Sequence, residues 1–168
     1  MGAGGVEADR PAHVSRAKAR GSARGLTLDS GALIKLESGD EYVRALLTGA
    51  MKAGSPLAVP TGVIAQTWRG GPRMARIARL LGDETVEIVD LDAPVAKAVG
   101  LLAARCGHRD VVDVSVALCA TERGHAIVTT DPGDLTTVNP NLELVRIPGP
   151  ADGTRSHTGR RSRRKPKT

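Results

Sequence analysis

Four aspartates stand at positions where carboxylates are able to share one divalent metal ion. Asp29 comes directly after a short apolar stretch, and Asp131 follows the most strongly apolar one, with Asp134 three residues further on. Asp113 lies in the first turn of a predicted helix. Carboxylates gathered at one place repel each other unless a cation is present. Ligation by oxygen alone selects a hard ion such as Mg²⁺ or Mn²⁺.

Such a cluster requires that the elements carrying the acids meet at one edge. The carboxyl ends of neighbouring parallel strands are about 5 Å apart, so Asp29 and Asp131 face each other if their strands are neighbours. Asp110 precedes Asp113 by three residues, a spacing that places both on the same face of a helix. A metal ion held there activates water and neutralises charge on a phosphodiester.

Each aspartate also has a structural explanation, which the sequence leaves open. Asp29 and Asp110 suit the N-caps of helices, and Asp131 and Asp134 suit a turn before a short helix. Other catalytic signatures are missing from the sequence, including a phosphate-binding GxxxxGKS loop and a GxSxG elbow. The four histidines are scattered and none looks like a catalytic base: His13, His108, His125 and His157.

Strand-like and helix-like stretches alternate along the chain. This alternation predicts an α/β protein with three α/β/α layers and a mostly parallel sheet of four or five strands. The predicted strands are 26–28, 57–60, 86–89, 126–130 and 142–147, and the predicted helices are 30–37, the stretch from Asp40 to Gly54, 61–68, 72–81, 93–106 and 110–123.

Composition fits a single domain between two basic arms. The 168 residues are 40% hydrophobic and carry a formal charge of +6. We expect a flexible arm at 1–24 (+3), a domain at 25–148 within a middle part of charge −3, and a disordered tail at 149–168 (+6). Aromatic residues make up 1%, so base stacking on aromatic platforms is not expected.

Two features point to a cytoplasmic protein. No stretch is long and apolar enough to suggest a membrane span or a signal sequence, so no membrane partner is expected. The two cysteines, Cys106 and Cys119, have no metal-ligand spacing and suit buried thiols in a reducing compartment.

Arginines follow the second predicted strand. Arg69, Arg73, Arg76 and Arg79 are spaced by four, three and three residues, which places the last three along one stripe of a helix. The stripe is either a solvated face or a surface that contacts phosphate groups or a partner; Arg69, Arg73 and Arg76 are our candidates for RNA binding.

With these segments in view, the chain resembles PIN-domain ribonucleases of the VapC toxin family over about residues 25–148. The resemblance rests on Leu-Asp-Ser-Gly-Ala-Leu-Ile near the start, Asp-Val-Val-Asp-Val-Ser-Val-Ala in the late helix and Thr-Thr-Asp-Pro-Gly-Asp-Leu after the fourth strand. It implies a PIN-like fold, Mg²⁺-dependent endoribonuclease activity on an RNA substrate, inhibition by a cognate antitoxin in a type II toxin–antitoxin pair, and a homodimer.

Position by position, the resemblance implies that Asp29, Asp113 and Asp131 are the catalytic and metal-binding acids. Asp110 and Asp134 match accessory acids, and the choice between Asp110 and Asp113 as the direct ligand stays open. Two further positions support the acids: Thr130 matches a small hydroxyl residue, and Gln66 stands where the family has glutamate.

The glutamine leaves two hypotheses. An amide attracts a divalent cation less than a carboxylate does and cannot act as a base, so Gln66 predicts weak metal binding and slow cleavage. The alternative is an inactive PIN-like module that binds an antitoxin or RNA. A third possibility, an α/β phosphotransfer module with Mg²⁺ in its acidic pocket, is disfavoured because no lysine lies near the end of the last strand.

Overall fold

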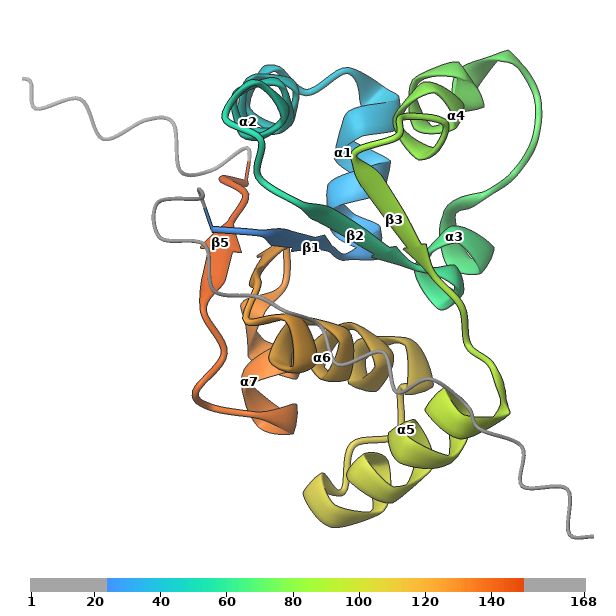
Figure 1. Ribbon diagram of the computed structural model, residues 1–168, viewed down its shortest axis with the longest axis vertical. Coiled ribbons are helices and arrows are strands. Elements are labelled where there is room, and N and C mark those ends of the chain that lie inside the picture. The colour runs from blue at the N-terminus through green and yellow to red at the C-terminus, as the bar shows by residue number, and fades with distance from the viewer. Residues whose placement is uncertain (1–23, 150–168) are drawn as a thin grey trace, which may run out of the picture.

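Five parallel strands form a single sheet in the computed structural model, which describes residues 24–149. The strands are β1 (Leu26–Leu28), β2 (Leu57–Pro60), β3 (Val86–Val89), β4 (Ala126–Thr129) and β5 (Leu144–Arg146), in the order β3-β2-β1-β4-β5 (Figure 1). The arms expected at 1–24 and 149–168 fall outside the described residues, apart from Arg24 and Gly149. Strands β4 and β5 are shorter than predicted.

Helices cover both faces of the sheet. Helices α1, α2 and α4 lie on one face and α5, α6 and α7 on the other (Figure 1). This arrangement confirms the predicted three-layer α/β/α fold with a parallel sheet. The helices are α1 (Ser30–Ser38), α2 (Glu41–Lys52), α3 (Thr61–Thr67), the 3₁₀ turn η1 (Pro72–Met74), α4 (Ala75–Leu81), α5 (Ala93–Cys106), α6 (Val111–Arg123) and α7 (Pro132–Val138).

Helix ends follow local chemistry. The Asp40 carboxylate accepts a hydrogen bond of 3.1 Å from the Val43 N–H and begins α2, as predicted. Gly107 and Gly124 end α5 and α6 with φ of 70° and 64°, a left-handed conformation that suits glycine. The sequence predicts Trp68 inside the helix after β2, but its backbone is extended and it ends α3.

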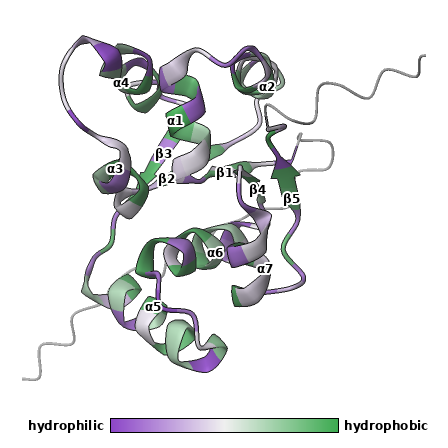
Figure 2. Ribbon diagram, turned by 180° about the vertical axis from the view of Figure 1, so that it is seen from behind, coloured by the Kyte–Doolittle hydropathy of each residue, from purple (hydrophilic) through white to green (hydrophobic). Residues whose placement is uncertain are grey.

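The main core lies where the central strands meet the helices around them. Leu28, Val59 and Ile127 on the strands are fully buried, as is Leu33 on α1. Central strands of a parallel sheet are covered on both faces, which explains their continuous apolar sequence. In Figure 2 most of α6 is hydrophobic, because this helix packs against β1, β2 and β4 and also against α5 and α7.

Within residues 24–149, no helix has the combination of length and hydropathy that crossing a membrane requires.

Candidate functional site

The chain leaves β1 and β4 toward opposite sides of the sheet. Helix α1 follows β1 on one face, whereas α7 follows β4 on the other (Figure 1). The two strands are parallel neighbours, with Leu28 opposite Val128. In open parallel sheets, ligands bind in the crevice that forms where neighbouring strands diverge in this way. Asp29 and Asp131 both follow strands that end at this edge, as the sequence predicts.

Asp29 is the most enclosed of the predicted acids, with an exposed fraction of 6%. One carboxylate oxygen caps α1 and accepts hydrogen bonds from the Ser30 N–H at 2.6 Å and the Ser30 hydroxyl at 3.2 Å. The other oxygen accepts a hydrogen bond of 2.7 Å from the Thr129 hydroxyl on β4. Asp29 is therefore both a helix cap and a carboxylate held in one orientation at the edge of the sheet.

Asp113 lies in the first turn of α6 and contacts a histidine that the sequence did not indicate. The His108 Nε2 and one Asp113 carboxylate oxygen are 2.9 Å apart, and both side chains are mostly buried. Burial raises the pKa of Asp113 most, the His108 hydrogen bond opposes this change, and the negative charges of Asp110 and Asp29 raise the pKa further. Asp29, Asp110 and Asp113 are therefore near enough to interact electrostatically.

The remaining acids of the predicted site are more exposed. Asp110 caps α6 by accepting hydrogen bonds from the backbone N–H groups of Val112 and Asp113, at 2.8 and 3.4 Å. Asp131 caps α7 through the Gly133 N–H at 3.2 Å, and Asp134 lies exposed in the first turn of that helix. The capping explanation therefore holds for Asp29, Asp110 and Asp131, and it does not exclude a second role for them.

The donors present suit a hard cation, although the set is small. Among residues 24–149, no three Asp, Glu, His or Cys side chains are grouped closely enough to hold a metal ion as they stand. Mg²⁺ keeps several of its waters and is commonly bound through only one or two carboxylates. Asp29 and Asp113 supply two carboxylates in a partly buried place, which fits this mode of binding.

Gln66 lies in the last turn of α3 and is exposed. Its backbone carbonyl accepts a hydrogen bond of 2.5 Å from the Arg69 guanidinium, and no hydrogen bond joins its side chain to another described residue. Helix α3 nevertheless packs against α1 and α6, the helices that follow Asp29 and carry Asp113.

Two neighbouring threonines at the end of β4 have different surroundings. The sequence indicates Thr130, which is exposed. Its hydroxyl oxygen lies close to Gly31: a Cβ atom added to that glycine would be 2.1 Å from the oxygen. Thr129 is fully buried and contacts Asp29. Sequence reasoning missed Thr129; the available signal was the alternation of side chains along the strand, which turns adjacent residues to opposite faces. No sequence signal indicated the contact between His108 and Asp113.

The predicted arginine stripe divides into separate environments. The Arg69 side chain donates hydrogen bonds to the backbone carbonyls of Gln66 and Trp68 at the end of α3, and Arg73 is exposed in η1. Arg76 donates a hydrogen bond of 2.7 Å to the Glu37 carbonyl near the end of α1. Arg76 and Arg79 also line a groove with Arg44 on α2.

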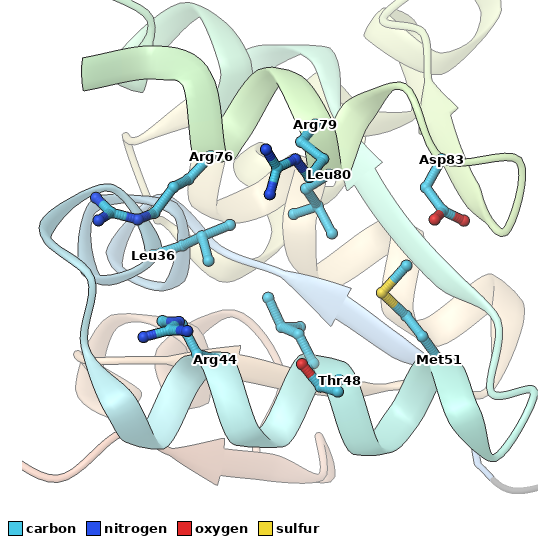
Figure 3. A pocket seen from close by; sticks show the side chains of 9 residues that line it. Leu36, Arg44, Thr48, Met51, Arg76, Arg79, Leu80 and Asp83 are labelled. Carbon is cyan, nitrogen blue, oxygen red and sulfur yellow. The ribbon is translucent and has the colours of Figure 1, made fainter. Parts of the chain in front are cut away.

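This groove lies between α2 and α4 and measures about 400 Å³ (Figure 3). Leu36, Leu47, Met51 and Leu80 give it an apolar lining, and three arginines and one acid, Asp83, lie along it. The groove is separate from the Asp29 edge: none of its lining residues belongs to the acidic group described above. An apolar surface bordered by guanidinium groups suits an amphipathic partner that carries acidic side chains.

Comparison with solved structures finds similar folds at low sequence identity. The VapBC2 complex of Rickettsia felis, bound to a DNA fragment from its promoter, contains a chain that matches with a TM-score of 0.58 and 16% identity over 73% of this chain and 98% of that one. The DNA-bound VapBC of Salmonella typhimurium matches with a TM-score of 0.54 and 16% identity over 74% and 98%. A toxin–antitoxin complex from Klebsiella pneumoniae matches with a TM-score of 0.53 and 17% identity over 72% and 96%.

Comparisons with protein-family models and with curated proteins find no match. The structural likeness covers most of the described domain and nearly the whole of each matched chain, which confirms the resemblance seen in the sequence at the level of the fold. This chain has the fold of the VapC-type PIN-domain toxins.

Proposed function

We propose that this protein is the toxin of a type II toxin–antitoxin pair and cleaves RNA as a Mg²⁺- or Mn²⁺-dependent endoribonuclease. The observation that carries the proposal is that Asp29 and Asp131, more than one hundred positions apart in the chain, follow neighbouring parallel strands that end at one edge of the sheet. Asp113 on α6 is the second acid, and the negative charge of Asp29 contributes to raising its pKa. Carboxylates brought together in this way favour a bound cation.

Asp29 and Asp113 would hold the ion. When bound, the ion polarises a phosphodiester and activates water for attack on phosphorus. The Thr129 hydroxyl orients Asp29, and the His108 ring orients Asp113. Supporting contacts of this kind fix the direction in which a ligating oxygen points. Asp131, two residues beyond Thr129, is the candidate third acid; its carboxylate accepts a hydrogen bond of 3.2 Å from the Gly133 N–H.

A specific observation favours the alternative of a weak or inactive module. The chain has glutamine where the family has glutamate, and Gln66 is exposed. The charge that a third or fourth carboxylate would add is therefore missing from α3. The proposed nuclease is then expected to bind its metal weakly and to turn over slowly.

Cleavage assays on wild type and Gln66→Glu separate these alternatives. Both proteins are incubated with a mixed-sequence RNA in Mg²⁺, in Mn²⁺ and in EDTA, and Asp29→Asn and Asp113→Asn serve as matched controls that keep size but remove charge. We expect metal-dependent cleavage by the wild type, faster cleavage by Gln66→Glu and none by either asparagine variant. If neither wild type nor Gln66→Glu cleaves RNA, the nuclease proposal fails and the binding module remains.

The groove between α2 and α4 is the surface that we assign to the antitoxin. We propose that an amphipathic segment of the antitoxin binds there, with apolar side chains against Leu47 and Leu80 and acidic ones near Arg44 and Arg79. Co-expression with the product of an adjacent small gene tests this. Arg79→Glu is expected to weaken the complex, whereas Arg105→Glu on α5, outside the groove, should leave it intact.

We further propose a homodimer in the cytoplasm. The dimer is implied by the family resemblance and is tested by light scattering of the purified chain. The cytoplasmic location is supported by Cys106 and Cys119, which are both free thiols and suit a reducing compartment.

A further inference from the structure

The single tryptophan of the chain is exposed at the end of α3. Trp68 has an exposed fraction of 43%, which is unusual for so large an apolar ring. Its backbone N–H donates to the Ile64 carbonyl at 2.8 Å, so its main chain is anchored to the helix while its side chain meets solvent. Neither the core nor the proposed metal site makes use of this ring.

An arginine fixes the backbone on either side of the ring. The Arg69 guanidinium donates hydrogen bonds to the Trp68 carbonyl at 3.1 Å and to the Gln66 carbonyl at 2.5 Å. These bonds fold the Arg69 side chain back over the end of α3. The guanidinium group and the indole ring are therefore presented by the same turn of chain, next to the residue that stands in the position of the family's glutamate.

The segment that follows is open. Gly70 and Gly71 have φ of 73° and 81°, and a Cβ built on either would meet no atom within 4 Å. The connection from α3 to α4 bows away from the rest of the domain (Figure 1), and much of it is hydrophilic (Figure 2). A ligand can therefore reach this segment, which runs from Trp68 to Arg73, from solvent without displacing packed side chains at the two glycines.

Charge identifies the class of ligand. Between Glu41 and Asp83 the chain contains no acidic residue and six basic ones, which are Arg44, Lys52, Arg69, Arg73, Arg76 and Arg79. A protein partner for an exposed tryptophan is usually held in part by side chains of both signs. A ring on a segment of chain whose charged residues are all basic favours a polyanion with flat apolar groups, and single-stranded nucleic acid combines phosphates with bases that stack.

Trp68 lies where one RNA strand could contact both the ring and the carboxylates. Helix α3 begins directly after β2, at the edge of the sheet where the carboxylates lie, and its seven residues span about 10 Å. Its first turn approaches α6 closely, since a Cβ on Gly62 would lie 3.3 Å from a methyl group of Val112. A short oligonucleotide is long enough to extend from the acids to the far end of α3.

We infer that Trp68, with Arg69 and Arg73, forms a single-base stacking site for single-stranded RNA beside the acidic edge. This inference rests on the proposed function and names a specificity element for its substrate. The low aromatic content excludes a row of stacking rings, but one exposed ring is sufficient to hold one base.

Binding without cleavage tests the site. The full chain is titrated in EDTA with an unstructured 12-nucleotide RNA, and tryptophan fluorescence is recorded; the chain holds one tryptophan, so any change in emission reports on Trp68. We expect the RNA to quench the emission of the wild type. Because Trp68→Ala and Trp68→Phe hold no tryptophan, affinities of all variants are measured by fluorescence anisotropy of the same RNA carrying an end label. We expect a loss of affinity of about tenfold in Trp68→Ala and partial recovery in Trp68→Phe, because stacking energies commonly correspond to such factors. Tyr42→Ala is the matched control, since Tyr42 is an aromatic ring of nearly equal exposure (44%) on α2.

Three results would overturn the inference. Unchanged emission on saturation with RNA removes the ring from the interface. Equal binding of an abasic strand of the same length and charge shows that phosphates alone are recognised. A shift of Trp68→Ala from dimer to monomer in light scattering, with RNA affinity retained, assigns the ring to a protein interface. The titration contains no metal, so it does not depend on cleavage. If the protein proves inactive as a nuclease but RNA still quenches the Trp68 emission, the stacking site is supported. If the protein cleaves RNA but RNA leaves the Trp68 emission unchanged, the stacking site is contradicted.

Discussion

The Thr129 hydroxyl on β4 donates a hydrogen bond of 2.7 Å to the Asp29 carboxylate at the end of β1, one hundred residues earlier in the chain. The same hydroxyl accepts a hydrogen bond of 3.0 Å from the Asp131 N–H. Thr129 thus connects the two strand-end aspartates through one oxygen atom. Both residues of the Thr129–Asp29 pair are buried, so water does not readily replace this bond.

Removing this hydroxyl should destabilise the protein. Thr129→Ala and Thr129→Ser lose the same methyl group and differ in the hydroxyl alone, so their comparison isolates the bond. We expect the serine variant to be more stable than the alanine variant by about 1–3 kcal/mol, the cost of leaving buried polar groups without a partner. Urea unfolding measures the difference, and equal midpoints for the two variants would show that the hydroxyl contributes nothing.

Asp113 is expected to reduce stability at neutral pH. Its pKa is raised above the ordinary 3.8, first by burial. Between 3.8 and the raised pKa the folded chain holds a proton that the unfolded chain has released, so the free energy of unfolding falls as pH rises through this window. We expect Asp113→Asn to be more stable than wild type at pH 7, by about 1 kcal/mol, the usual size of a stabilising substitution.

The stability gain of Asp113→Asn should disappear below the window, where the wild-type carboxyl is protonated in both states. Thermal unfolding at pH 7 and pH 3.5 checks this. A constant difference at both pH values would assign the gain to packing rather than to charge. Loss of cleavage with a gain in stability is the combination expected of a functional acid.

His125 should make the protein sensitive to mild acid. Burial lowers its pKa below the ordinary 6.5, and the positive charge of Arg123 lowers it further. As pH falls from 6.5 through the lowered pKa, the unfolded chain takes up a proton that the folded chain does not, so the free energy of unfolding falls, by at most about 1.4 kcal/mol per pH unit. Above pH 6.5 this group has no effect.

His125→Gln should flatten the stability profile between pH 6.5 and 5, measured by urea unfolding at half-unit steps. Glu87→Gln is the companion variant: Glu87 is among the charges that raise the pKa of His125, so its removal is expected to steepen the profile in this range. An unchanged slope in His125→Gln would mean that another group causes the acid sensitivity.

Arg76 and Arg73 should differ in role although the sequence groups them. Arg76 donates to the Glu37 carbonyl at 2.7 Å and so stabilises the end of α1, where a positive charge is also favourable. We expect Arg76→Met to lose about 1 kcal/mol of stability. Arg73→Met should stay within about 0.5 kcal/mol of wild type, as is usual for exposed positions.

RNA binding should show the opposite pattern. If Arg73 contacts a phosphate of single-stranded RNA, Arg73→Met reduces the slope of log affinity against log salt by about 0.7, whereas Arg76→Met leaves the slope unchanged. A lower slope in Arg76→Met would return this residue to the RNA-binding surface that the sequence proposes.

The local features of the fold were predictable from the sequence. Apolar runs located all five strands, and capping residues such as Asp40, Gly107 and Gly124 located helix ends, because these signals depend on a few adjacent residues. Placing Asp29 and Asp131 at one edge required only that β1 and β4 be neighbours, which the sheet order confirms.

Side-chain partners depended on the tertiary structure. Which of two adjacent threonines meets Asp29 is decided by the register of β4 against β1, and a shift of one residue would have reversed it. The contact between His108 and Asp113 depends on the path of the turn between α5 and α6, which no periodic pattern encodes. Residue types placed Asp29 and Asp131 after strands that end at one edge of a parallel sheet. Only long-range packing decided that Asp29 is buried there and Asp131 is exposed, because burial is a property of the folded surface and not of the chain.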